Sequence, residues 1–338
     1  MTLRRRWADT LYPALVKQCR EQVGTEIDEV TDADVRSLPA YPWFSWLERG
    51  CQKMLWRVVT DAVRAGALEK PDTDAQQLLA LDDSLQLPEW YTAWDIHVQP
   101  GGVWSSDEAA AVYEAGAKLV MLGENDDYGF HHLFTRTAIP DRPYRKIVDL
   151  GCGFGKSTWP LKEKYPDAEV LGIDLSAPCL RLAACKVQQR GLDVHFLQAD
   201  GINTGLSPSS VDLLTSTMLV HEMPVDALEQ LLEEAARILA PGGTLRFLDF
   251  RHSPDPLRNL SLREHGARNN EPFLPAAMAA DLSAMAYKVG LANPGWRAFD
   301  ERSEGLLPSL DWPERDEWHF PWAVFAAEKP QMETHNEH

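Results

Sequence analysis

The amino-acid sequence predicts an α/β fold: a doubly wound sheet, mostly parallel with an antiparallel last strand, preceded by a helical N-terminal region. Three observations support this class. Apolar residues recur at helical spacing through residues 1–140. From Lys146 onward short apolar strands alternate with helices, which is typical of a parallel sheet covered on both faces. The first of these strands runs into a glycine-rich turn, DLGCGFG, at residues 149–155.

The N-terminal region, residues 1–140, is expected to contain mainly helices. Its clearest amphipathic stretch carries Leu47, Cys51, Leu55 and Val58 on one face. Ser106 or Asp107 is placed to cap a later helix that stops at Gly123. The expected helices cover residues 6–22, 44–68, a short part of 67–83, 107–121 and 130–138.

The second domain is expected to span residues 141–330, with a polar tail at 331–338. Its predicted strands are 146–150, 169–174, 194–198, 211–217, 244–250, 296–301 and 318–327. Helices are predicted up to residue 165 and at 177–190, 226–239 and 276–289.

The composition excludes several classes of partner. The 338 residues contain 33 Lys and Arg against 51 Asp and Glu, a formal charge of −18 that repels nucleic acids and anionic membranes. No apolar run is long enough to span a bilayer, and the basic N-terminus lacks the apolar stretch of a secretory signal. The five cysteines show no CxxC spacing, which favours reduced thiols in a cytoplasmic protein. The twelve tryptophans are expected mainly in the core rather than in a pocket wall.

The glycine-rich turn is compatible with three cofactor classes. A triphosphate loop requires G-x-x-x-x-G-K-[ST], but Leu150 stands where its first glycine belongs. A dinucleotide loop requires a small third residue, and Lys156 occupies that place. The remaining pattern is D-x-G-x-G-x-G, followed 25 positions after Asp149 by a second acidic residue at a strand end, Asp174. That residue is placed to bind a ribose.

On these residues the sequence resembles the class I S-adenosylmethionine-dependent methyltransferases, over about residues 146–328. The resemblance implies a Rossmann-like sheet and S-adenosylmethionine as cofactor. It rests on five motifs in order, at residues 149–155, 172–174, 198–200, 211–212 and 239–243.

The resemblance implies a role for each cofactor-binding candidate. Asp149 would accept from the ammonium of the cofactor, directly or through water, and Asp174 from the two ribose hydroxyls, a contact of roughly 1.5–3 kcal/mol. Asp200 would accept from the adenine amino group. The other candidates provide bare backbone beside the amino acid part or the adenine edge: Gly151, Gly153, Gly155, Gly201 and Ile202. Lys156 is expected to be a solvated helix residue.

The sequence says less about the methyl acceptor than about the cofactor, because methyl transfer mainly requires proximity and alignment. His221, after the fourth strand, is the candidate general base; a role in ordering its loop or packing on the cofactor is equally open. The N-terminal region is expected to form a lid whose candidate substrate contacts are Trp94, His97, Gln99, Tyr128 and His132, with interdomain packing as the alternative. Residues 268–273 could hold a carboxylate, although a surface loop is favoured. Histidine spacing predicts no metal site.

Three functions follow as hypotheses. The first is a methyltransferase acting on a small molecule at O, N, S or C, with quinone C-methylation and thiol S-methylation as branches. The second is a non-catalytic cofactor-binding module that recognises a partner. The third, a dinucleotide oxidoreductase, is disfavoured by Lys156.

Overall fold

A nine-stranded sheet forms the centre of the described part of the chain. The computed structural model describes residues 2–23, 31–66, 75–121 and 128–331. The strand order is β1-β4-β3-β2-β5-β6-β9-β7-β8. Pairing is parallel from β1 to β6, whereas β9 runs antiparallel to β6 and β7. The strands are β1 (Leu79–Ala80), β2 (Lys146–Leu150), β3 (Glu169–Asp174), β4 (His195–Gln198), β5 (Val211–Thr217), β6 (Leu239–Phe250), β7 (Ala292–Asp300), β8 (Gly305–Leu306) and β9 (Trp322–Glu328). The predicted fold class, including its antiparallel last strand, is confirmed.

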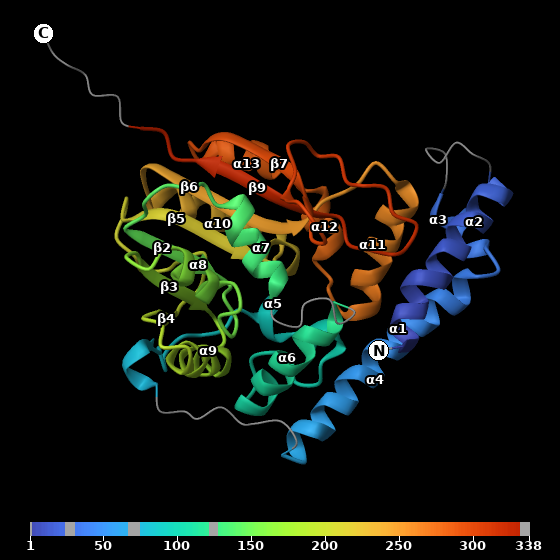
Figure 1. Cartoon of the computed structure of the whole chain (residues 1–338), viewed down its shortest axis with the longest axis horizontal. Helices are drawn as coiled ribbons and strands as arrows, with labels where there is room; N and C mark the ends of the chain where they lie inside the picture. Colours follow the sequence, from blue (N-terminus) through green and yellow to red (C-terminus); the bar gives the residue numbers. More distant parts are fainter. Residues whose placement is uncertain (1, 24–30, 67–74, 122–127, 332–338) are drawn as a thin grey trace, which may run out of the picture.

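Helices cover both faces of this sheet (Figure 1). On one side lie α7 (Gly129–Ala138), α8 (Thr158–Lys164) and α9 (Ala177–Gln189); on the other lie α10 (Val225–Ile238), α12 (Leu274–Ala279) and α13 (Leu282–Lys288). Neighbouring strand residues divide between the two cores: Ile147 and Leu213 belong to the first, Val148 and Leu214 to the second. The alternation follows from the two-residue period of a strand.

The N-terminal helices lie beside the sheet rather than on its faces (Figure 1). They are α1 (Thr2–Arg6), the π-helical turn η1 (Trp7–Leu11), α2 (Tyr12–Val23), α3 (Asp32–Ser37), α4 (Tyr41–Arg64), α5 (Glu89–Thr92) and α6 (Asp107–Val120). Ser106 caps α6, as predicted. Helix α6 packs between α4 and α9, and α11 (Pro256–Asn269) packs on α4. The N-terminal region therefore contacts the rest of the fold through α4 and α6, among other elements, and also supplies the edge strand β1 of the sheet.

Several elements differ from the sequence-based expectation. The helix α11 lies in a stretch for which no helix was predicted, because its buried face includes the charged residues Arg258 and Arg268. The helix expected over 276–289 is two helices, α12 and α13. The strands β1 and β8 were not predicted, since two residues are too short for a periodic signal. In the stretch 67–83, where a short helix was expected, the described residues 75–83 contain only the 3-10 turn η3 (Gln76–Leu78) followed by β1. The expected stop at Gly123 lies outside the described residues.

Cysteine and tryptophan side chains mostly serve packing. All five cysteines are buried and free of disulfides. Trp56 and Trp159 are fully buried, whereas Trp43, Trp46 and Trp94 are exposed. Among the helices of the described ranges, none has the length and apolar character needed to cross a bilayer.

Candidate active site

A large cavity opens where the parallel strands end. It encloses about 1580 Å³, including the part open to solvent. Residues that follow β2, β3, β4 and β5 line one side, and residues of α4, α5, α6 and the turn η4 (Ile96–Val98) line the other. The carboxyl ends of the strands of an open α/β sheet are the usual place for a ligand, at the point where the strand order reverses. Here that point lies between β2 and β5.

The glycine-rich turn forms the floor of the cavity after β2. Gly151 and Gly153 both have positive φ, 64° and 53°, a conformation that glycine adopts without a steric penalty. A Cβ on Gly151 would lie 2.9 Å from Leu219 Cδ1. The positive φ and this close approach favour glycine at the position, and both glycines present bare backbone to the cavity.

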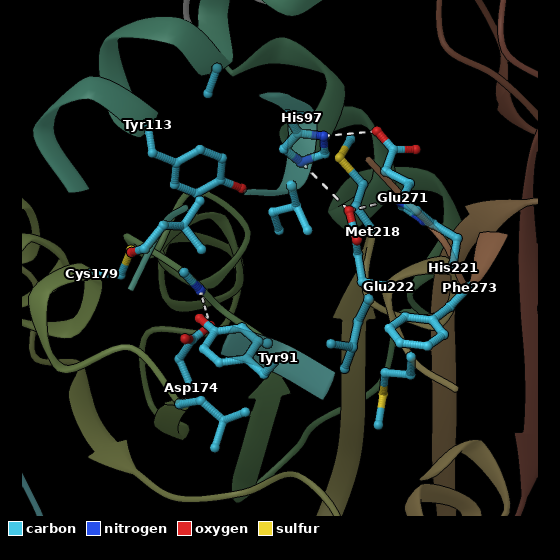
Figure 2. A pocket seen from close by; sticks show the side chains of 18 of the residues that line it. Tyr91, His97, Tyr113, Asp174, Cys179, Met218, His221, Glu222, Glu271 and Phe273 are labelled. Carbon is cyan, nitrogen blue, oxygen red and sulfur yellow. Dashed lines mark hydrogen bonds and ion pairs between the residues drawn. The ribbon is translucent and has the colours of Figure 1, made fainter. Parts of the chain in front are cut away.

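Asp174 lies at the end of β3, facing the same space (Figure 2). Its Oδ2 accepts from the amide of Gly153 at 2.8 Å, and its Oδ1 accepts from the amide of Ser176 at 2.8 Å. Burial raises the pKa of Asp174, and these two amides oppose the rise. The glycine turn thus fixes the orientation of the carboxylate.

Asp200 and Gly201 line the cavity after β4, as neighbours of Asp174 on the adjacent strand. The amide of Ile202 donates to Asp200 Oδ1 at 3.1 Å. Burial raises the pKa of Asp200, and this hydrogen bond opposes it. Ile202 itself packs against the second core rather than lining the cavity.

Asp149 lies behind the glycine turn and does not line the cavity. Its Oδ2 accepts from the hydroxyls of Ser157 (2.6 Å) and Thr158 (2.7 Å), and its Oδ1 accepts from Thr215 (3.0 Å). Burial raises the pKa of Asp149 to about 6, against the opposing effect of the hydroxyl donors. The carboxylate therefore braces the loop and the start of α8.

Lys156 is buried and lines the cavity, which corrects the expectation of a solvated helix residue. Its Nζ lies 3.2 Å from the hydroxyl of Tyr113 and 5.1 Å from the centre of that ring. Burial lowers the pKa of Lys156 to about 8. Tyr113 comes from α6, so the N-terminal region contributes directly to this end of the cavity.

His221 is buried between two carboxylates. Its Nδ1 lies 2.6 Å from Asp249 Oδ1 and its Nε2 lies 3.3 Å from Glu222 Oε1. Burial alone lowers the pKa of His221, but the two carboxylates outweigh it and hold the pKa well above its ordinary value. The two carboxylates therefore favour the protonated ring, which donates from both nitrogens.

His97 brings the N-terminal region to the cavity beside Glu222 and Glu271 (Figure 2). Its Nδ1 lies 2.9 Å from Glu271 Oε1, and its Nε2 lies 3.5 Å from Glu222 Oε1. The carbonyl of His97 accepts from Trp56 Nε1 (2.7 Å) and Gln52 Nε2 (3.2 Å) of α4. Burial lowers the pKa of His97, but the Glu271 hydrogen bond and the nearby Glu222 charge raise it overall.

Glu271 reaches the cavity because Asn270 ends α11 in the left-handed conformation, at φ 60°. Asparagine tolerates this conformation, and the amide of Glu271 then bonds back to the carbonyl of Gly266 at 2.9 Å. Arg268, Asn269 and Glu271 are all buried, so the favoured interpretation of 268–273 as a surface loop is wrong.

The other predicted residues lie away from the cavity. Gly155 is buried against Ala183 and Phe196. Gln99 is buried and donates to the carbonyls of Gly102 and Ala109. The rest are an exposed tryptophan, a tyrosine packed on the first core and a histidine paired with Glu163 on α8: Trp94, Tyr128 and His132. None of these five is among the residues lining the cavity in the described part of the chain.

Sequence reasoning missed Glu222, Glu271 and Tyr113. Both glutamates lie in segments that were singled out, beside His221 and after Arg268. If the sequence had predicted a helix over 256–269, Glu271 would have been placed just after the left-handed residue that ends this helix. Tyr113 lacked any signal beyond helical spacing.

The relationship to known proteins follows from comparison with curated sequences. The demethylmenaquinone methyltransferase of Thermus thermophilus is 34% identical over 180 residues, which cover 53% of this chain and 79% of that protein. The chain belongs to the class I S-adenosylmethionine-dependent methyltransferases. A trans-aconitate 2-methyltransferase from Azoarcus is 36% identical over 189 residues, 51% of this methyltransferase and 72% of that protein.

Two further comparisons concern the sheet domain of the methyltransferase. Residues 147–243 match the methyltransferase domain family model. A solved structure of the phosphoethanolamine N-methyltransferase 2 of Haemonchus contortus, in complex with S-adenosylmethionine, is 15% identical with a TM-score of 0.44, covering 65% of this chain and 60% of that one. The protein is an enzyme that uses S-adenosylmethionine as its cofactor.

Proposed function

We propose that the enzyme transfers the methyl group of S-adenosylmethionine to a small molecule enclosed between the sheet edge and the N-terminal region. The observation that carries this proposal is the composition of the cavity wall. Asp174 and Gly153 line it from the sheet domain, whereas Trp56, His97 and Tyr113 line it from α4, η4 and α6. A wall closed in this way favours a compact acceptor over a nucleic acid, and the charge of −18 agrees.

The cofactor site is assigned from the cavity-lining groups. Asp174 accepts from the ribose hydroxyls, and Asp200 lies at the adenine edge. Gly151 and Gly153 lie along the amino acid part, whose carboxylate pairs with Lys156. Supporting this pairing, the Lys156 ammonium is buried in the cavity wall and its nearest polar partner is a neutral hydroxyl.

Asp149 acts on the cofactor through the loop instead of touching it. Its carboxylate is fully buried and occupied by three hydroxyl donors, so a direct contact with the cofactor ammonium would require the loop to open. The hydrogen bonds from Ser157 and Thr158 fix the Asp149 carboxylate relative to the glycine turn.

The acceptor is proposed to be an aromatic or apolar compound. A second cavity adjoins the first, with Phe320 and Trp322 in both linings. Its wall contains the aromatic residues Trp7, Phe130 and Trp318 as well as charged side chains such as Arg4 and Glu301. Of the acceptors named for the relatives, a quinone precursor such as demethylmenaquinone suits the aromatic part of these walls.

His221 is proposed as a positioning residue and not as the general base. Asp249 and Glu222 occupy both its ring nitrogens, and Asp249 also accepts from the amide of Val220 at 2.8 Å. The imidazole therefore holds the turn after β5 and orients Glu222 toward the cavity. A protonated ring has no lone pair with which to accept a proton.

The test has two steps. Calorimetry with S-adenosylhomocysteine measures cofactor binding, and labelled S-adenosylmethionine is then incubated with a panel of phenols, quinols, thiols, amines and trans-aconitate. We expect binding, and label transferred to an aromatic member. Binding without transfer to any aromatic member would contradict the proposed acceptor; absence of binding would overturn the cofactor site.

A further inference from the structure

Carboxylates and imidazoles alternate along one wall of the cavity. This carboxylate–imidazole chain consists, in spatial order, of Asp249, His221, Glu222, His97, Glu271, His265 and Glu48. Successive side chains approach within 2.6–3.9 Å. The members come from β6, η5 (Val220–Glu222), η4, α11 with the turn after it, and α4. Apart from the adjacent His221 and Glu222, these segments meet only through tertiary structure.

The charges of this chain are unequally matched. Glu48 pairs with the guanidinium of Arg268, but Asp249, Glu222 and Glu271 have imidazoles as their charged partners. Buried carboxylates require positive charge or hydrogen-bond donors around them. Glu271 is 2% exposed, and its Oε2 has no hydrogen-bond partner among the described residues. The centre of the chain thus has unused capacity to bind a cation.

We propose that His97, Glu222 and Glu271 bind one divalent metal ion that holds an oxygen atom of the methyl acceptor. One ligand atom from each residue lies within 4.8 Å of the other two, so small side-chain movements bring all three to one ion. Two carboxylate oxygens and one imidazole nitrogen suit Mn²⁺ or Fe²⁺, and binding of the ion displaces the proton of His97 to solvent. Three protein ligands leave further coordination positions for an acceptor with one or two oxygen donors, such as an ortho-diphenol.

This inference rests on the proposed function and specifies its acceptor. A metal-bound hydroxyl loses its proton to solvent more easily. The resulting oxygen forms a bond to the methyl carbon while the carbon–sulfur bond breaks, and the electron pair of that bond returns to the sulfur. The products are the methyl ether and S-adenosylhomocysteine. The spacing of histidines along the sequence gave no sign of this site, because its three ligands come from distant segments.

The test is Mn²⁺ binding to the full chain after chelator treatment, followed through the loss of the free-ion paramagnetic resonance signal. We expect one bound equivalent. Glu271→Gln should weaken binding at least tenfold, and His97→Gln should do the same if the first variant folds poorly. The matched control is Glu163→Gln, which alters a carboxylate–imidazole pair outside the cavity and should leave Mn²⁺ affinity unchanged.

Affinity for S-adenosylhomocysteine is measured on the same samples. A twofold or smaller change in the cavity variants shows that they are folded, so that weaker Mn²⁺ binding is due to lost ligands. Equal Mn²⁺ binding by wild type, Glu271→Gln and His97→Gln would overturn the metal site and leave the cofactor site standing. If the wild type bound Mn²⁺ but not S-adenosylhomocysteine, the proposed function would be contradicted but the metal site would not.

Discussion

At the residue scale, Asp174 is the side chain whose geometry most directly predicts a binding loss. Asp174→Asn removes the charge that accepts from the ribose hydroxyls and sets an NH₂ group against the amide of Gly153 or Ser176. Affinity for S-adenosylhomocysteine should fall about ten- to hundredfold, equivalent to roughly 1.5–3 kcal/mol. Asp212→Asn is the matched control: this carboxylate also accepts from two amides, those of Arg145 and Lys146, but outside the cavity. Equal losses in both variants would contradict the assignment.

Lys156 predicts a pH dependence of cofactor binding. Because burial lowers its pKa to about 8, the ammonium is present below that pH and lost above it. An anionic carboxylate binds the protonated form, so affinity for S-adenosylhomocysteine should be level from about pH 6.5 to 7.5 and decline above about pH 8. Lys156→Met should be weaker throughout and lose this decline relative to wild type. In Lys162→Met, which alters a lysine on α8 bonded to the Ala168 carbonyl, the decline should persist.

At the scale of elements, the strands were predictable and α11 was not, for physical reasons. Ile147, Val148 and Leu150 are fully buried, so the strand is apolar in its own sequence. The buried Arg258 of α11 is satisfied by the carbonyl of His319, a partner that no local pattern reveals. The site divides in the same way: Asp174 and Asp200 follow strand ends, whereas His97 and Glu271 meet only through packing between helices.

The end of α11 provides the prediction for this scale. Asn270 holds a left-handed conformation that turns Glu271 into the cavity. Alanine, unlike asparagine, is poorly tolerated in the left-handed conformation. Asn270→Ala should therefore lower the free energy of unfolding by about 1 kcal/mol. Asn270→Gly, which also loses the side-chain bond to the Asp95 carbonyl, should remain closer to wild type. Urea unfolding of the three proteins measures this; because neither variant can make the side-chain bond, a glycine variant less stable than the alanine variant would contradict the backbone argument.

At the scale of the whole molecule, the N-terminal region and the sheet with its helices both line the cavity that we propose as the active site. Ser176, at the start of α9, donates to the carbonyl of Val103 at 3.0 Å, which ties the segment before α6 to the cofactor side. On the acceptor side, Trp56 of α4 holds the carbonyl of His97. These two hydrogen bonds predict that a change in α4 affects cofactor binding and acceptor binding differently.

Trp56→Phe tests this division. It removes the indole donor to His97 and part of a buried ring, and should cost about 1–3 kcal/mol of stability. Since Asp174 and Gly153 lie on the other side of the cavity, affinity for S-adenosylhomocysteine should stay within about twofold, while KM for the acceptor rises severalfold. Trp43→Phe, at an exposed position of the same helix, should change neither quantity. A parallel loss of cofactor affinity in Trp56→Phe would mean that α4 supports the whole cavity, and the proposed separation into a cofactor half and an acceptor half would then be wrong.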